Sequence, residues 1–283
     1  MNILFLLLPA IGWGILPLIV KKIDSKIGNQ ILGTGIGALF VGLIVQFIFS
    51  PNGVSVSVFL ISMASGILWT IGQTGQYKSL ELMGVTKTMP ITTGLQLVGT
   101  SLISLFAFGE WPTLLNKIVG TGAVILIIIG AVLTSISDEK GQYDQFKKGL
   151  SILIFTSVGY WGYSIVPKLV DVSGVSIFFP QMLGVFTAAL IYVACTSPAV
   201  IKEKSTWALS ISGMIFSVAA FCYIISAQNI GIATSYIFSQ LNVVIATVGG
   251  IFILKEKKTK MELKFIVVGL ILIVSGSVIT SFS

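Results

Sequence analysis

"IIIGAVLTSIS" at residues 127–137 and "IVSGSVITSFS" at residues 273–283 are two versions of one segment. They match at six of eleven positions without a gap, 146 residues apart. Other pairs recur at nearly the same spacing, including Ser65-Gly66 with Ser212-Gly213, Gly84 with Gly231, and Phe106 with Phe252. A near-constant offset along the chain indicates an internal duplication. The sequence therefore predicts two similar halves, residues 1–136 and 149–283, joined by a linker at 137–148.

The composition indicates that both halves lie in a membrane. Of the 283 residues, 55% are hydrophobic and only 10% are charged, and the mean hydropathy is +1.01. Soluble domains carry roughly 25% charged residues. Apolar runs of about 20 residues, the length that crosses a bilayer core, recur between short charged breaks. We expect an all-α integral membrane protein with ten transmembrane helices, at residues 2–20, 31–49, 56–77, 85–108, 115–135, 149–166, 175–196, 207–228, 232–254 and 263–282.

Five spans per half is an odd number, so the second half is expected to enter the membrane inverted relative to the first. The lysines agree with this expectation. Counted together with the residues at the span ends, the breaks after spans 1 and 3 hold three and two lysines, while their counterparts after spans 6 and 8 hold one and none. In this arrangement 15 of the 17 lysines share one face, which the positive-inside rule makes cytoplasmic. Both termini are then predicted outside and the linker inside. Inverted repeats are typical of secondary transporters.

Several kinds of chemistry are absent from the sequence. The chain contains no His and no Arg, which excludes His metal sites, His proton relays and bidentate Arg clamps. Cys195 and Cys222 lie in apolar runs and are expected to be packing residues. The net charge of +7 comes from orienting lysines and does not point to nucleic acid. We expect no metal, no cofactor and no obligatory protein partner.

The stretch "GVTKTMPITTGLQLVGT" at residues 84–100 places polar groups inside a predicted span. We expect Pro90 to disrupt this helix because it lacks an N–H group. Its counterpart is "GIATSYIFSQLNVV" at residues 231–244, and Gln96 pairs with Asn242 at the 146-residue spacing. Unpaired polar groups in hydrocarbon cost several kcal/mol, so these must face a neighbour or a wet cavity. The candidates for substrate contact in the two stretches are Thr92, Thr93, Gln96, Ser239, Gln240 and Asn242.

Further amides and aromatic residues lie near the middle of other spans. Gln73 and Gln76 share one face of the third span, with Trp69 one turn before Gln73. Trp13 and Trp161, with Tyr160, occupy corresponding places in spans 1 and 6. Flat rings beside amides suit sugars, which present C–H patches and hydroxyl groups. The alternative is that the polar groups bond helix to helix and that the rings face lipid.

No span has Asp or Glu near its middle, which favours an uncharged substrate. Glu110 and Glu256 form a symmetric acidic pair, each at the end of its span. They are candidates for proton coupling, or alternatively interfacial anchors.

Four segments resemble the bacterial glucose and ribose uptake proteins of the drug/metabolite transporter superfamily. They are "NQILGTGIGALFVG" (29–42), "SGILWTIGQTGQYKSLELMGVTKTMPITTGLQLVGTSL" (65–102), "GEW" (109–111) and "GIATSYIFSQLNVVIATVGGIFILKE" (231–256). The resemblance covers nearly the whole chain. It implies ten helices in inverted halves, the bacterial plasma membrane, and uptake of a neutral monosaccharide, glucose first, with proton symport as the energy source.

The resemblance also implies residues that line the sugar path: Asn29, Gln30, Trp69, Gln73, Gln76, Thr92, Gln96, Ser239 and Gln240. Glu81 and Lys87 depart from it because small polar residues are expected there, and Asn242 stands where an aliphatic residue is usual. An exporter of drugs or amino-acid-like metabolites on the same fold is the main alternative. A membrane-embedded enzyme lacks support, because the chain has no nucleophile–base pair, and a scaffold would not require polar helices.

Overall fold

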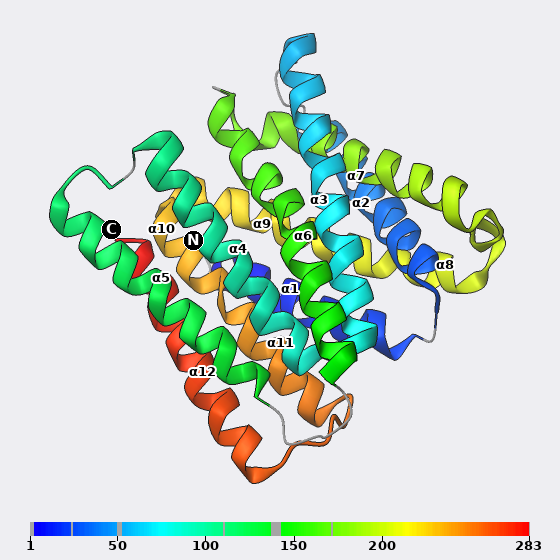
Figure 1. The fold of residues 1–283 in the computed structure, drawn as a ribbon. Helices are drawn as coiled ribbons and strands as arrows, with labels where there is room; N and C mark the ends of the chain where they lie inside the picture. Colours follow the sequence, from blue (N-terminus) through cyan, green and yellow to red (C-terminus); the bar gives the residue numbers. More distant parts are fainter. Residues whose placement is uncertain are drawn as a thin grey trace.

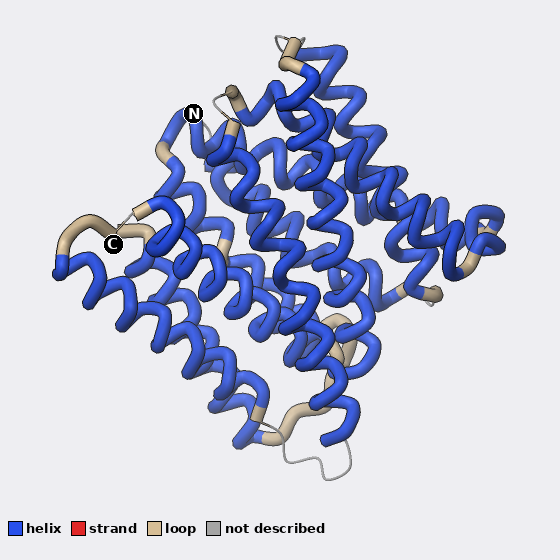
Figure 2. Tube along the Cα trace, turned by 45° about the horizontal axis from the view of Figure 1, so that its top comes forward, coloured by secondary structure: helices blue, strands red, loops and turns tan. Residues whose placement is uncertain are grey.

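Helices make up nearly all of the protein. The computed structural model describes residues 3–23, 25–49, 53–109, 111–136, 143–170 and 172–282, and every regular element in these ranges is a helix (Figure 1). Figure 2 shows long helices joined by short loops. The expected all-α class is therefore confirmed.

The helix bounds follow the predicted spans closely. The first half contains α1 (Ile3–Lys22), α2 (Ile27–Phe49), α3 (Val56–Met83), α4 (Val85–Phe108) and α5 (Leu114–Ser135). The second contains α6 (Tyr143–Leu169), α7 (Gly174–Thr196), a short 3-10 helix η1 (Pro198–Lys202), α8 (Lys204–Ala208), α9 (Ser210–Ile230), α10 (Ile232–Ser239), α11 (Leu241–Phe252) and α12 (Lys260–Thr280). Within the described residues, nine stretches are long and apolar enough to cross a membrane. Helix α6 occupies the remaining predicted span and begins at Tyr143, six residues inside the predicted linker.

Glycines bring the helices of the two halves into close contact. A Cβ atom added to Gly66 of α3 would collide with the Gln181 carbonyl oxygen of α7, and one added to Gly184 of α7 would collide with α3. The same holds for Gly37 of α2 and Gly213 of α9, whose added Cβ atoms would meet each other's helix. Because small residues let helix backbones approach, these four positions fix two tight crossings. Gly37 and Gly184 are 147 residues apart, as are Gly66 and Gly213.

Helices α5 and α12 lie side by side at one edge of the molecule (Figure 1). Their contact also contains two matching glycine positions, one on each helix. An added Cβ at Gly130 would meet Ile273, and one at Gly276 would meet Ile127. Gly276 lies 146 residues after Gly130, and Ile273 lies 146 residues after Ile127. Each contact therefore has the same pair of positions as the other, with the two helices interchanged. Equivalent contacts thus occur twice between the halves.

The core lies between the halves, and the outer surface is apolar. The rings of Trp69, Tyr77, Phe178 and Phe216 are buried in one central cluster. Large apolar side chains elsewhere face outward, and Phe106 is 81% exposed. A surface of this kind suits contact with lipid tails.

The predicted disruption at Pro90 is wrong, because α4 is continuous through it. Pro90 removes one backbone hydrogen bond of α4, and the helix continues on both sides of it. The interruption occurs instead in the counterpart, where Gln240 separates α10 from α11. There the Asn242 amide donates to the Ser239 carbonyl at 2.7 Å and the Ser239 hydroxyl donates to the Tyr236 carbonyl at 2.7 Å. Side chains that bond to local carbonyls compete with the helical ladder.

Candidate functional site

The centre of the molecule holds a small group of buried polar side chains, which we call the amide cluster. It consists of Gln73 and Gln76 of α3, Tyr160 of α6 and Met89 of α4, beside the ring of Trp69. Gln73 and Gln76 are three residues apart on one helix, so they share a face as expected. Three helices from both halves therefore meet at these side chains.

One hydroxyl group serves two amides in this cluster. The Tyr160 hydroxyl lies 2.9 Å from the Gln73 Oε1 atom and 2.9 Å from the Gln76 Oε1 atom. A tyrosine has a single hydroxyl proton and donates it to one acceptor at a time. The Gln76 Nε2 atom donates to the Met89 sulfur at 3.0 Å, which is a weak acceptor. The Gln73 Nε2 atom has no hydrogen-bond partner within the described part of the chain. A buried donor left in this way costs about 1–3 kcal/mol.

Aromatic rings form one wall of the cluster. Trp69 stacks on Phe216 of α9 with ring centroids 4.2 Å apart, and its edge contacts Tyr160. Residues 69 and 216 are 147 positions apart, so two equivalent positions of the halves meet ring on ring. Gly72 leaves the space that the Tyr160 ring occupies, since an added Cβ would collide with it.

Trp13 and Trp161 each bond to the backbone of a neighbouring helix. The Trp13 Nε1 atom donates to the Phe216 carbonyl at 3.3 Å, and the Trp161 Nε1 atom donates to the Leu95 carbonyl at 3.0 Å. Both indole N–H groups are therefore used in helix packing in this conformation.

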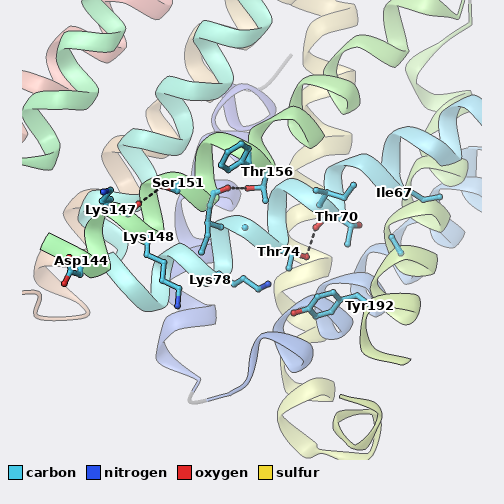
Figure 3. Close-up of a pocket in the computed structure, with 15 residues that line it drawn as sticks. Ile67, Thr70, Thr74, Lys78, Asp144, Lys147, Lys148, Ser151, Thr156 and Tyr192 are labelled. Carbon is cyan, nitrogen blue, oxygen red and sulfur yellow. Dashed lines mark hydrogen bonds between the residues drawn. The ribbon is translucent and has the colours of Figure 1, made fainter. Parts of the chain in front are cut away.

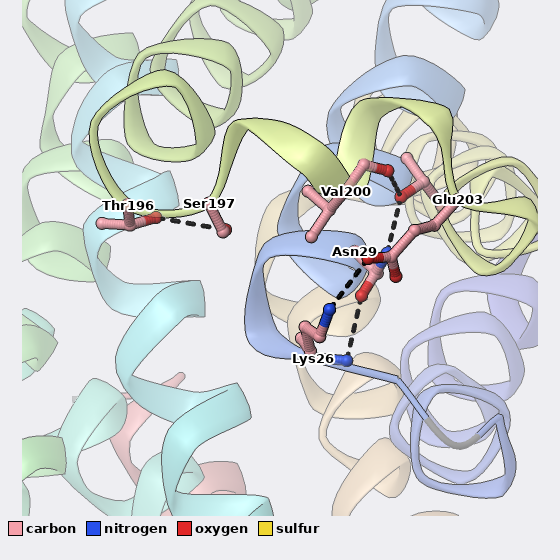
Figure 4. Close-up of polar contacts among 7 residues, drawn as sticks. Lys26, Asn29, Thr196, Ser197, Val200 and Glu203 are labelled. Atoms are coloured by element: carbon pink, nitrogen blue, oxygen red, sulfur yellow. Dashed lines mark hydrogen bonds and ion pairs between the residues drawn. The ribbon is translucent and has the colours of Figure 1, made fainter.

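Asn29 and Gln30 lie apart from the amide cluster, at the start of α2. Asn29 accepts from the Lys26 N–H at 3.0 Å and donates to Glu203 and Thr206, each at 2.9 Å (Figure 4). Lys26 also forms an ion pair with Glu203 at 2.8 Å. Gln30 donates to the Ser25 carbonyl at 3.3 Å. Asn29 thus joins α2 to Glu203, just before α8, and to Thr206 within α8, in the manner of a structural contact between helices.

The polar residues of α4, α10 and α11 form a looser second set. Thr92 and Thr93 are buried, and the Thr92 hydroxyl has no partner among the described residues. Gln96 and Asn242 are half-buried on the packed pair α4 and α11. Gln240 donates to the Ser239 hydroxyl at 3.3 Å. No hydrogen bond between described residues joins this set to the amide cluster.

Glu256 binds the N-terminus of α4. Its carboxylate accepts the N–H groups of Val85 at 2.6 Å and Thr86 at 3.1 Å, and also the Thr86 hydroxyl. A carboxylate is favoured at a helix N-terminus because the unpaired N–H groups there carry partial positive charge. Glu110, the other member of the predicted acidic pair, lies outside the described residues.

A large cavity of about 780 Å³ lies elsewhere, between α3, α6 and α7 (Figure 3). It is lined by Thr70, Thr74 and Lys78 on α3, and it contains none of the predicted site residues. Sequence reasoning missed this cavity because its lining residues come from three separate helices.

The sequence analysis also did not identify Tyr160 and Met89 as partners of the amides. Tyr160 carried a signal in its position beside Trp161, whereas nothing in the sequence pointed to Met89.

Comparison with known proteins supports the transport interpretation. The family model described as "Sugar transport protein" matches residues 4–283. A putative sugar uptake protein of Lactobacillus helveticus is 44% identical over 99% of this chain and 100% of its own length. A glucose uptake protein of Bacillus subtilis is 40% identical, over 98% of this chain and 97% of its length. A putative ribose uptake protein of Latilactobacillus sakei is also 40% identical, over 99% of this chain and 98% of its length.

A solved crystal structure resembles the whole fold. Its TM-score is 0.67 at 16% sequence identity, and the match covers 99% of this chain and 96% of the other. At this identity the likeness concerns the fold alone.

Proposed function

The chain belongs to the sugar transport protein family, a group of bacterial membrane proteins of sugar uptake, and from this premise we propose that it carries a neutral monosaccharide into the cell by alternating access. Glucose is the first candidate and ribose the second, since relatives bearing each name are equally similar. We place the sugar at the amide cluster.

The unpaired Gln73 amide nitrogen is the observation that carries this placement. A sugar hydroxyl both donates and accepts hydrogen bonds. It can accept from Gln73 Nε2 and donate to one of the two glutamine oxygens that, without sugar, compete for the Tyr160 proton. In this conformation the Tyr160 hydroxyl lies within hydrogen-bond distance of both amide oxygens. We infer that Tyr160 turns aside when sugar enters, and that Trp69 then offers its ring face to the C–H groups of the sugar.

Neutrality of the substrate fits the charges around the site. Lys87 and Glu262 are the buried charged residues in the described part of the chain. Glu262 belongs to the capping box at the start of α12, and Lys87 lies in the first turn of α4. A site that lacks carboxylates suits a sugar better than the organic cations among exporter substrates.

We infer that residues 1–136 and 149–283 form inverted halves that rock against each other. Reciprocal contacts support this: α3 crosses α7 as α9 crosses α2, and the glycines at both crossings are 147 residues apart. An odd number of spans per half then requires inversion. Trp69 stacks on Phe216, which is 147 residues further along the chain, and this contact supports a symmetry axis between the halves beside the amide cluster. Motion of α9 away from α3 would uncover Trp69, as alternating access requires.

Proton coupling through Glu256 belongs to the same proposal. Protonation of the Glu256 carboxylate would weaken its hydrogen bonds to the Val85 and Thr86 N–H groups. These bonds join α4 to the segment before α12. The hydrogen bonds of Glu256 lie on the lysine-rich face, which we propose to be cytoplasmic, with both termini outside. Glu110 is the proposed counterpart on the other face.

Uptake by purified protein in liposomes tests the proposal. Labelled glucose and ribose are offered with and without an inward pH gradient, and we expect saturable uptake that the gradient increases. Gln73→Ala is expected to abolish it. Gln181→Ala is the matched control, because Gln181 is equally buried on α7 but bonds to Ser65 outside the cluster. Equal uptake by wild type and Gln73→Ala would remove this residue from the site, and indifference to the gradient would remove proton coupling.

A further inference from the structure

The cavity between α3, α6 and α7 has an apolar wall that opens outward. Ile71 and Phe155 line it and are 49% and 78% exposed, so this side faces the surroundings of the helices. In a membrane protein those surroundings are lipid tails. The cavity therefore has the position of a lateral groove in the bilayer.

The threonine and serine hydroxyl groups of the cavity already donate hydrogen bonds to helix carbonyls. Thr70 donates to the Gly66 carbonyl, Thr74 to the Thr70 carbonyl at 2.7 Å, and Thr156 to the Ile152 carbonyl at 2.8 Å. Ser151 donates to the Lys147 carbonyl at 2.9 Å. A sugar would find few free partners along this wall, whereas an acyl chain requires none.

One end of the cavity is basic. Lys78, Lys147 and Lys148 lie there, and Asp144 is the one acidic residue among the described residues that line the cavity (Figure 3). Lys78 is held over the Tyr192 ring, with its Nζ atom 5.9 Å from the ring centroid. Among the described residues, no carboxylate forms an ion pair with these three lysines. Among the residues that line the cavity, three lysines against one carboxylate give this end excess positive charge.

The length of the groove matches one leaflet. Lys78 and Ile67 line its two ends on α3, eleven residues apart. At 1.5 Å per helical residue this is roughly 16 Å, close to half of a hydrocarbon core about 30 Å thick. A phosphate at the lysines would place its acyl chain against Ile67, Ile71 and Phe155.

We propose that this cavity binds an anionic phospholipid of the cytoplasmic leaflet, with the phosphate at Lys78, Lys147 and Lys148 and an acyl chain between α3 and α6. Basic pockets between transmembrane helices are suited to such headgroups. The proposal rests on the orientation proposed above. It does not depend on the identity of the sugar or on the amide cluster. Because α3 carries both the groove and Gln73 on different faces, a bound lipid would brace the helix that holds the sugar site.

Native mass spectrometry of the full chain tests this proposal. The protein is titrated with phosphatidylglycerol, with phosphatidylcholine, and with phosphatidylglycerol in the presence of inorganic phosphate. We expect phosphatidylglycerol to bind preferentially and phosphate at equal concentration not to displace it. The triple variant K78Q/K147Q/K148Q should lose about five-fold in affinity per lysine removed.

Two variants make the result specific. K257Q/K258Q/K260Q removes the same charge from another lysine-rich segment of the same face and should bind phosphatidylglycerol like the wild type. Ala188→Phe fills the cavity at a lining residue while it keeps all three lysines, and should also lose the lipid. Equal binding of both lipids by the wild type, or displacement by phosphate, would overturn the proposal. So would equal losses in the two triple variants, or undiminished binding by Ala188→Phe.

Discussion

At the scale of single residues, the amide cluster is built from groups that nearly satisfy one another. The Tyr160 hydroxyl has one proton for two amide oxygens, and the Gln76 nitrogen has a sulfur as its acceptor. Each of these hydrogen bonds is weaker than the bonds that a hydroxyl able to donate and accept would form with the same amide atoms. In the proposed function, these internal hydrogen bonds are exchanged for bonds to the hydroxyl groups of the sugar.

The sequence predicted the shared face of Gln73 and Gln76, because residues three apart on a helix are neighbours. It could not predict that Tyr160 and Met89 contact them, since this depends on how three helices lie against one another. The family resemblance placed Asn29 on the sugar path, and this stays a prediction; in this conformation Asn29 bonds to Glu203 and Thr206 at a helix start.

The contact of Glu203 with α2 gives a prediction on pH. Hydrogen bonds from Lys26, and next from Asn29, hold the pKa of the Glu203 carboxyl below its ordinary value of 4.5. A lowered pKa in the folded state means that this contact stabilises the fold fully above pH 4.5. The contribution is lost as the pH falls through the lower, folded pKa. We expect Glu203→Gln to lower the unfolding temperature at pH 7 and to have no effect well below pH 4. Thermal unfolding in detergent measures both, and a difference that stays constant with pH would contradict it.

At the scale of elements, most helix ends were predicted to within four residues because apolar runs in a membrane must form complete helices, while the end of α3 and the start of α6 each extend six residues beyond the predicted span. The break in the helix was predicted at the wrong element. Proline near the start of α4 removes one bond and leaves the helix intact, whereas Ser239 and Asn242 bond to nearby carbonyls and interrupt its counterpart. Polar side chains inside a helix were therefore a better signal of the break than Pro90.

The tie between Glu256 and α4 gives a prediction at this scale. Glu256→Ala leaves the Val85 and Thr86 N–H groups without their acceptor, so we expect their hydrogen exchange to rise about five- to thirty-fold, as for a lost helix cap. Hydrogen exchange with mass spectrometry on the segment from Gly84 measures this. Glu262→Ala is the matched control, because Glu262 caps α12 and should leave exchange at α4 unchanged. Equal exchange in wild type and Glu256→Ala would show that the tie does not hold α4.

At the scale of the whole molecule, contacts between residues 1–136 and 149–283 recur at positions 146 or 147 residues apart in the sequence. Gly37, Gly66, Gly184 and Gly213 make the two crossings, and Trp69 stacks on its own equivalent, Phe216. The offset of 146–148 residues could be seen in the sequence, but it did not tell which helices would cross. That choice depends on where glycines let two backbones approach.

Inversion of the halves predicts opposite exposure of nearly equivalent loops. Gly53 follows α2, and Lys202 lies in the corresponding segment after α7; both are exposed. We introduce Gly53→Cys and Lys202→Cys separately into a chain that carries Cys195→Ser and Cys222→Ser. A membrane-impermeant maleimide added to intact cells should label the first variant and label the second only after permeabilisation. Labelling of both from the same side would contradict the inversion.

The central claim is that a neutral monosaccharide binds where the two halves meet, against Trp69. The most direct measurement is the fluorescence of Trp69 as the only tryptophan of the chain, after Trp→Phe changes at the other four, Trp13, Trp111, Trp161 and Trp207. We predict that glucose or ribose changes the emission saturably, that glucose 6-phosphate does not, and that Gln73→Ala removes the response. Trp69 emission that does not change when glucose or ribose is added, or that changes as much in Gln73→Ala as in the chain with Gln73, would contradict the account.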